Sequence, residues 1–120
     1  MLEKFLLEII EKLNKPSISE KADKLLEYMK YYKINQYIYP GAVSREVGLD
    51  IKDVYILLES IANEKLLERN YEIYCHKCEK YQGDICKTIS EAREKVCAHC
   101  GYDIEDIDMI LIYKVVNANE

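Results

Sequence analysis

Apolar residues in the first third of the chain recur at spacings of three and four positions, a period that predicts amphipathic helices. The first helix is expected over about residues 2–14, and Pro16 blocks its continuation. Ser17 and Glu20 have the spacing of a capping box, which predicts that a second helix begins there. The buried face of this second helix is expected to contain Ala22, Leu25, Leu26, Met29 and Tyr32.

A break with turn-forming residues at positions 39–41 (Tyr-Pro-Gly) separates these helices from the next two. The apolar positions of a short helix follow it, at Ala42, Val43 and Val47. Gly48 is expected to end this short helix, and Asp50 is expected to be the N-cap of a longer one. The buried face of the longer helix is expected to include Val54, Leu57 or Leu58, and Ile61.

The pattern changes to strand-like alternation over residues 68–75, which predicts a strand. Residues 109–116 are apolar on nearly both faces and predict a strand that is covered on both sides or by a partner. Between the two strands, Thr88 or Ser90 is expected to cap a short helix that runs to about Val96. Helices followed by strands predict an α+β fold.

Two Cys-x-x-Cys pairs are the strongest chemical signal in the chain. Cys75 and Cys78 form the first pair, Cys97 and Cys100 form the second, and residues 79–96 lie between them. Zinc prefers four tetrahedral ligands, and each pair can deliver two sulfurs to one ion. Four thiolates close the coordination shell and leave no position for a reactive water. The pattern therefore predicts a structural Zn²⁺ site rather than a catalytic one.

Other interpretations of these cysteines stay open at this point. The thiols can be ordinary buried or exposed side chains, or one pair can be a redox dithiol, although nothing before Cys75 predicts the parallel sheet that a thioredoxin-like dithiol needs. His76 or His99 can replace a cysteine as ligand, because imidazole also binds zinc. Cys86 lies outside both pairs and is given no role.

The segment 41–67 resembles the winged helix-turn-helix family, with a short helix, a turn at positions 48–50 and a longer helix that leads toward a strand. The part with the cysteine pairs resembles the zinc ribbons of prokaryotic transcription and signalling proteins. Archaeal general transcription factors of the TFIIE-alpha type join the same two units. The resemblance implies a winged-helix domain with an extra N-terminal helix over residues 1–74, and a zinc ribbon with a C-terminal strand over residues 75–120. Lys65 stands where the family often has glycine, so either the turn differs or Lys65 adopts a left-handed conformation.

The charge of the chain favours protein contacts over nucleic acid. The net charge is −5 and the pI is about 5.2, whereas a domain that binds phosphates usually has a basic patch. The expected recognition helix, residues 50–65, has Lys52 and Lys65 against four acidic residues. We therefore expect a non-enzymatic adaptor or regulator that acts through protein contacts, with a DNA-binding transcriptional regulator as the alternative. The expected partner or DNA contacts are Ser44, Arg45, Lys52, Tyr55, Ile56 and Arg69.

The N-terminal segment, the apolar runs and the cysteines indicate the expected location of the protein. Charged residues from Glu3 to Lys12 interrupt the apolar run that a secretion signal needs, and no apolar run approaches the ~20 residues of a membrane span. A cytoplasmic protein with reduced cysteines is expected. The N-terminal helix either completes the core or pairs with a second copy, so a homodimer is expected as well. No nucleophile–base pair, phosphate loop or small-molecule site is evident in the sequence.

Overall fold

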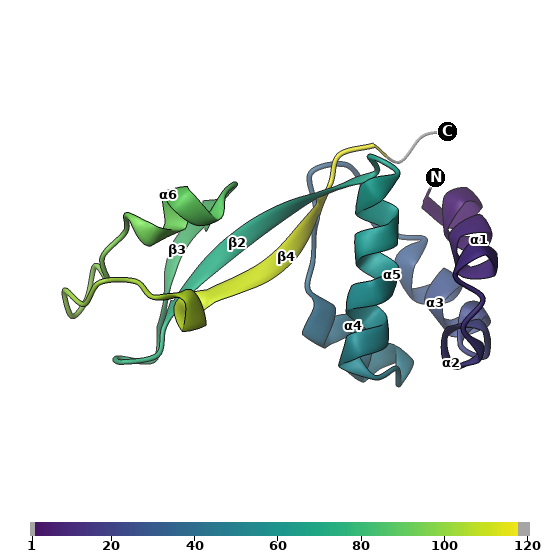
Figure 1. Ribbon diagram of the computed structural model, residues 1–120, viewed down its shortest axis with the longest axis horizontal. Coiled ribbons are helices and arrows are strands. Elements are labelled where there is room, and N and C mark those ends of the chain that lie inside the picture. Colours follow the sequence, from purple (N-terminus) through teal and green to yellow (C-terminus); the bar gives the residue numbers. More distant parts are fainter. Residues whose placement is uncertain (1, 118–120) are drawn as a thin grey trace. The chain divides into compact units, whose positions relative to one another are not determined.

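The computed structural model describes residues 2–117, which form helices and a four-stranded antiparallel sheet (Figure 1), and this confirms the expected α+β class. The chain divides into two compact units. We call Met1–Glu68 together with Tyr113–Glu120 the helical unit, and Arg69–Ile112 the cysteine unit. The division falls inside strands β2 (Leu67–Cys75) and β4 (Met109–Val115).

The helical unit begins with α1 (Leu2–Leu13), α2 (Pro16–Ser19) and α3 (Ala22–Met29). The predicted first helix and the predicted burial of Leu25 and Met29 are confirmed. The predicted capping box at Ser17 is wrong, because α2 begins on Pro16 and neither α2 nor α3 has a side-chain cap. A proline in the first helical position needs no amide partner and has its φ angle preset, so Pro16 starts a short helix of its own. Tyr32 lies beyond the end of α3.

The next two helices, α4 (Pro40–Val47) and α5 (Ile51–Asn63), follow in the predicted order. The expected break at positions 39–41 is wrong in part, because α4 begins on Pro40, which has its φ angle preset for the first helical position. Gly48 ends α4 in the left-handed conformation, with φ of 78°, and its amide donates to the Ser44 carbonyl. Asp50 is the N-cap residue of α5, but its side chain makes no capping hydrogen bond. The predicted inner face of α5 is buried and consists of Val54, Leu57, Leu58 and Ile61.

Lys65 forms the turn between α5 and β2. Its φ angle is 67°, so the left-handed conformation is the one that this residue adopts in place of a glycine. The Lys65 amide donates to the Ala62 carbonyl at 2.9 Å, and Leu66 and Leu67 then turn into the interior. A residue other than glycine in the left-handed backbone conformation costs about 1–2 kcal/mol of conformational energy. Burial of the two leucines offsets that cost.

The sheet has the strand order β1-β4-β2-β3, with β1 at Tyr37–Ile38 and β3 at Lys80–Cys86. Both predicted strands, β2 and β4, are confirmed. Strands β1 and β3 were not predicted. β1 is only two residues long, and β3 contains Gly83 and few apolar residues. In the cysteine unit β3 pairs with β2 in the register Tyr71 to Cys86 and Cys75 to Lys80.

The two units have separate groups of buried side chains. In the helical unit the buried apolar residues come from all the longer helices and from β4, and they include Leu6, Ile9, Leu25, Val47, Leu57 and Tyr113. In the cysteine unit one cluster consists of Ile73, Cys75, Cys86, Ala92, Cys97 and Ile104. The short helix α6 (Ile89–Arg93) supplies Ala92 to this cluster, and its N-cap is Thr88, whose hydroxyl accepts from the Glu91 amide at 3.1 Å.

Candidate metal centre

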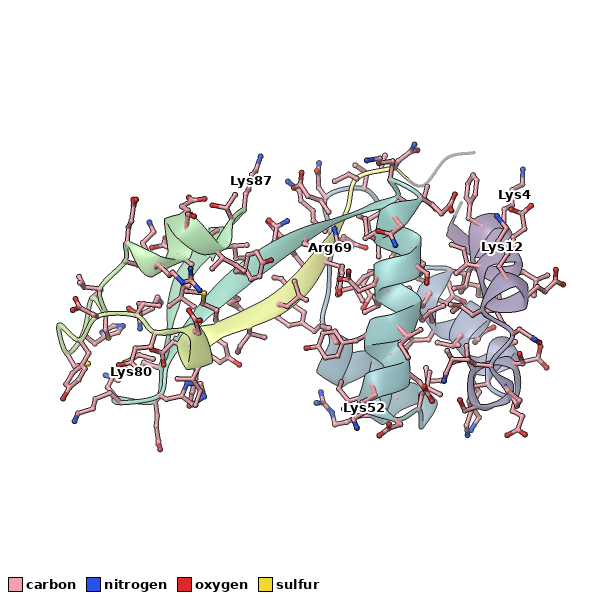
Figure 2. The ribbon with its side chains drawn as sticks, viewed as in Figure 1. Lys4, Lys12, Lys52, Arg69, Lys80 and Lys87 are labelled. Carbon is pink, nitrogen blue, oxygen red and sulfur yellow. The ribbon has the colours of Figure 1, made fainter. Side chains whose placement is uncertain are left out.

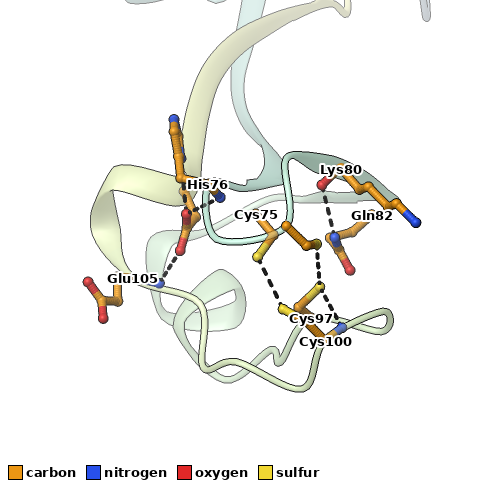
Figure 3. A network of polar contacts seen from close by, with 9 residues as sticks. Cys75, His76, Lys80, Gln82, Cys97, Cys100 and Glu105 are labelled. Carbon is orange, nitrogen blue, oxygen red and sulfur yellow. Dashed lines mark hydrogen bonds and ion pairs between the residues drawn. The ribbon is translucent and has the colours of Figure 1, made fainter.

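The four paired cysteines come together in the cysteine unit. Cys75 ends β2, and Cys78 follows in the turn that leads to β3. Cys97 and Cys100 lie in the loop between α6 and the 3₁₀ turn η1 (Asp106–Asp108). All four sulfurs lie within 4.8 Å of one another, so they could hold a metal ion (Figure 3). They are the cluster of possible metal ligands found among residues 2–117, as the sequence predicts.

The sulfur–sulfur distances fit a tetrahedral thiolate site. The Cys75 and Cys100 sulfurs lie 3.7 Å apart, and the Cys78 and Cys97 sulfurs lie 3.5 Å apart. A zinc–sulfur bond of about 2.3 Å gives a tetrahedron whose edge is about 3.8 Å. A disulfide would require about 2.05 Å, and all four cysteines are free thiols. The spacing therefore matches four ligands around one ion rather than two disulfides.

Both Cys-x-x-Cys turns have the same backbone geometry. The Glu79 amide donates to the Cys75 carbonyl at 2.7 Å, and the Gly101 amide donates to the Cys97 carbonyl at 2.9 Å. Glu79 and Gly101 each follow the second cysteine of their pair, and both are left-handed, with φ of 59° and 77°. The glycine adopts this conformation without strain, whereas the glutamate does not. The two turns therefore share this hydrogen bond and this left-handed position, although their residues differ.

Backbone amides make Cys97 the sulfur best prepared to be a thiolate. Burial alone would raise the pKa of Cys97, but the amides of Cys100 and His99 donate to its sulfur at 3.4 and 3.3 Å and bring the pKa down to about 6. Burial, together with hydrogen bonds to the thiols of Cys97, Cys75 and Cys100, raises the pKa of Cys78 to about 12. Such amide–sulfur bonds are a common support of thiolate ligands, since they stabilise negative charge on the sulfur.

A buried carboxylate, Asp108, holds the first turn in place, and sequence reasoning missed it. Asp108 is only 6% exposed. One of its oxygens accepts from the His76 amide and contacts His76 Nδ1, both at 3.0 Å, and the other accepts from the Glu105 amide at 2.9 Å (Figure 3). Burial would raise the pKa of Asp108, but these contacts from Glu105 and His76 lower it. The carboxylate therefore ties the residue after Cys75 to η1.

The second turn is held by polar contacts to its neighbours. The Gln82 side chain on β3 accepts from the Ala98 amide at 2.8 Å. The Cys97 amide donates to the Tyr102 carbonyl at 2.8 Å, and Val96 and Asp103 form an isolated antiparallel bridge. These contacts close the loop around Cys97 and Cys100. No pattern in the sequence marks Gln82 or Asp108 for this role, because each is a single polar residue that is distant in sequence from its partner.

The remaining candidates for the metal site lie outside the sulfur cluster. His76 directs Nδ1 to Asp108, and neither His76 nor His99 belongs to the ligand cluster found among the described residues. Cys86 is buried on β3 and is also outside that cluster. Burial raises the pKa of the Cys86 thiol, which keeps it protonated and unreactive near neutral pH.

The predicted interaction residues are spread over α4, α5 and β2. Ser44 donates its hydroxyl to the Leu49 carbonyl at 2.6 Å and so serves the turn between α4 and α5. Arg45, Lys52 and Ile56 are exposed. Tyr55 is half-buried, and burial raises the pKa of its phenol. Arg69 is exposed at the start of the cysteine unit.

Comparisons with known proteins give this chain no family: neither a scan against models of protein families nor searches of curated proteins and of solved structures found a match. Over residues 2–117, the helices are too short or too polar to cross a membrane.

Proposed function

We propose that this protein is a winged-helix module, stapled by one structural zinc ion in a ribbon, that works as a non-enzymatic adaptor or regulator through protein contacts. The winged-helix part of the proposal is supported by the order of α4, the turn at Gly48, α5 and β2. The left-handed Lys65 takes the place of the glycine that often ends this run in the family.

Zinc is the metal that best suits this donor set. Four thiolates are soft ligands, and a tetrahedral arrangement of four sulfurs favours zinc or iron over the hard cations. With four protein ligands the shell is closed, so zinc would stabilise the fold instead of activating a water. The small core cluster of the cysteine unit supports this, because it gives the unit little apolar surface to bury on its own.

The exposed surface of α5 is the observation that carries the proposed protein contacts. Ile51 and Ile56 are each 38% exposed on this helix. Lys52 is its one basic residue, against Asp53 and Glu59. A helix that reads DNA places basic and amide side chains against phosphates and base edges. Exposed isoleucines beside a single lysine are typical of a protein interface.

The basic residues of the chain are not concentrated on this helix. Figure 2 labels Lys4 and Lys12 on α1, Lys52 on α5, Arg69 on β2, Lys80 at the start of β3 and Lys87 just after it, so these basic residues are spread over several elements. The alternative function, DNA binding, is favoured by the exposed Arg45 on α4 and Lys52 at the start of α5. Both functions are therefore compared in one experiment.

Duplex binding by fluorescence anisotropy, at low and at physiological salt, separates the two functions. The adaptor proposal predicts no saturable binding of a mixed-sequence duplex at protein concentrations up to about 10⁻⁴ M, the weak end of non-specific DNA binding. A DNA reader would bind at low salt, lose affinity steeply as salt rises, and bind less well as Arg45→Glu or Lys52→Glu. That result would replace the adaptor proposal.

A photo-crosslinking amino acid at position 56 tests the protein contact directly. We expect protein adducts in cells from position 56, and none from a matched control at exposed Glu94, just beyond α6 in the cysteine unit. Adducts that contain nucleic acid at position 56, or equal adducts at both positions, would contradict the proposed surface.

The expected homodimer remains part of the proposal. Leu7 on α1 is 44% exposed and lies beside Leu26 in a shallow hollow that could accept a second copy of α1. Light scattering of the wild-type chain and of Leu7→Glu measures this: a dimer that becomes monomeric in the variant supports it, and a wild-type monomer rejects it.

A further inference from the structure

A groove lies between α3 and α4 in the helical unit, away from the residues assigned above. This open groove has a volume of about 680 Å³. It is lined by Asp23, Lys24, Glu27, Tyr28, Tyr31 and Glu46. Asp23, Lys24, Glu27 and Tyr28 follow one another at helical spacing on α3, and Glu46 comes from α4, which packs against α3. Tyr31 comes from the turn that follows α3.

Two acidic side chains of the groove are available to pair with a cation. Among residues 2–117, Asp23 and Glu46 form no ion pair, and both are exposed. Glu27 is paired with Lys30 at 3.0 Å. Lys24 is the one basic residue that lines the groove, so with Glu27 paired to Lys30 two carboxylates, Asp23 and Glu46, face a single ammonium there. The charge of the groove is complementary to a basic ligand.

Tyrosine rings form the apolar part of the groove. Tyr31 is 68% exposed, which is unusual for so large a ring. The ammonium of Lys30 already lies 5.1 Å from the centre of the Tyr31 ring, so this ring accepts a cation in the structure itself. Tyr28 is held by an edge contact with Tyr32, whose hydroxyl donates to the Tyr28 hydroxyl at 3.3 Å. An aromatic surface beside carboxylates suits a planar cation.

We propose that the groove between α3 and α4 binds an arginine-bearing segment of a partner protein, with a guanidinium against Tyr28 and Tyr31 and paired to Asp23 and Glu46. Arginine fits better than lysine because its flat fork stacks on aromatic rings and pairs with carboxylates. Nucleic acid is opposed by the carboxylates.

An extended segment suits the surface better than a small molecule. The groove is open, and two smaller hollows adjoin it along α3. One shares Asp23 and Glu27 and also contains Leu7, Leu26 and two lysines, Lys4 and Lys30, and the other shares Tyr28 and Tyr31. A peptide that continues past the arginine would meet leucines and lysines on one side and tyrosine rings on the other. The inference rests on the proposed function, since it names a partner chemistry, but it uses another surface than Ile56.

The test is a titration of the ¹⁵N-labelled full chain, loaded with zinc, followed by NMR. The probe is a short peptide with two arginines separated by glycines, and the matched control peptide carries citrulline in place of arginine. Citrulline keeps the shape and removes the charge. We expect the arginine peptide to shift amides of residues 23–31 and 46, and the citrulline peptide to leave them unchanged.

Substitutions then locate the binding. The double variant Asp23→Asn with Glu46→Gln should weaken arginine-peptide binding about tenfold, and Tyr31→Ala should weaken it about fivefold. The double variant Glu8→Gln with Glu11→Gln removes the same two charges from the exposed side of α1 and should change nothing. Equal binding of the citrulline peptide, an equal loss in this control variant, or shifts confined to other residues would overturn the inference. If the arginine peptide does not bind but protein adducts still form at position 56, the groove alone is rejected. If the peptide binds but no protein adducts form at position 56, the surface on α5 is rejected.

Discussion

The interiors of the helical unit and of the cysteine unit consist of different kinds of side chain. The helical unit buries aliphatic side chains from several helices, such as Leu6, Leu25, Val47 and Leu57. Half of the core cluster described in the cysteine unit consists of cysteines, and two of these, Cys75 and Cys97, are candidate metal ligands. A buried aliphatic side chain contributes about 1.5–3 kcal/mol, whereas a structural zinc ion contributes on the order of 10 kcal/mol. The comparison teaches that packing accounts for one unit, whereas the other has a small core for which the proposed metal would compensate.

Removal of the metal should have the largest effect and should separate the two units. A strong chelator, or Cys97→Ser, is expected to abolish zinc binding and the hydrogen-exchange protection of residues 69–112, because the remaining core is small. Protection of α1, α3 and α5 should persist. Cys86→Ser is the matched control: its sulfur lies outside the ligand cluster, so this variant should keep one zinc per chain. One zinc per chain with unchanged exchange in Cys97→Ser would show that Cys97 is not a ligand.

A cavity in the helical unit should have the opposite effect: it should lower the stability of the fold and leave zinc binding unchanged. Leu57→Ala removes a fully buried side chain from α5 and should lower the free energy of unfolding by about 2–5 kcal/mol. The zinc content should stay at one per chain, since no ligand comes from this unit. Denaturant unfolding and metal analysis measure both. Ile34→Ala, at an exposed apolar residue between α3 and β1, serves as the control and should change stability little.

The support given by Asp108 should be visible as zinc affinity. Asp108→Asn weakens the acceptor for the His76 and Glu105 amides, so zinc should be held about tenfold less tightly in competition with a chromogenic chelator. Asp106→Asn is the matched control, because Asp106 pairs with Arg93 at the surface. Equal losses in both variants would mean that net charge, and not the placement of the first turn, controls affinity.

The two cysteine turns offer the smallest and most local comparison. Gly101→Ala puts a side chain at φ of 77° with open space around it, so only backbone strain opposes it, and it should cost about 1 kcal/mol. Glu79→Gly relieves the same strain in the first turn and should be neutral or slightly stabilising. Thermal unfolding of the zinc-loaded variants measures both. A stabilised Gly101→Ala variant would contradict the equivalence of the turns.

The elements with strong periodicity could be predicted from the sequence, and the isolated ones could not. The inner face of α5 follows from the apolar spacing, and the left-handed Lys65 is one of the two outcomes that the missing glycine left open. The start of α2 was mispredicted because Ser17 has the pattern of a cap while Pro16 is the better first residue of a helix. Strand β3 has no apolar alternation, and its position depends on pairing with β2.

The candidate site divides in the same way. The four cysteines are a local repeat, so their spacing alone predicted that they meet. Asp108 and Gln82 hold the turns through partners that are distant in the chain, such as His76 and Ala98. A single carboxylate or amide carries no mark of such a partner in the sequence. Only the folded chain identifies these residues.

X-ray absorption at the zinc edge, on protein purified without chelator, tests the central claim most directly. The account predicts one zinc per chain with four sulfur neighbours at about 2.3 Å and no nitrogen or oxygen ligand. A shell that includes nitrogen would make His76 or His99 a ligand in place of a cysteine. Protein that holds no tightly bound metal, or whose paired cysteines are oxidised to disulfides, would contradict the account.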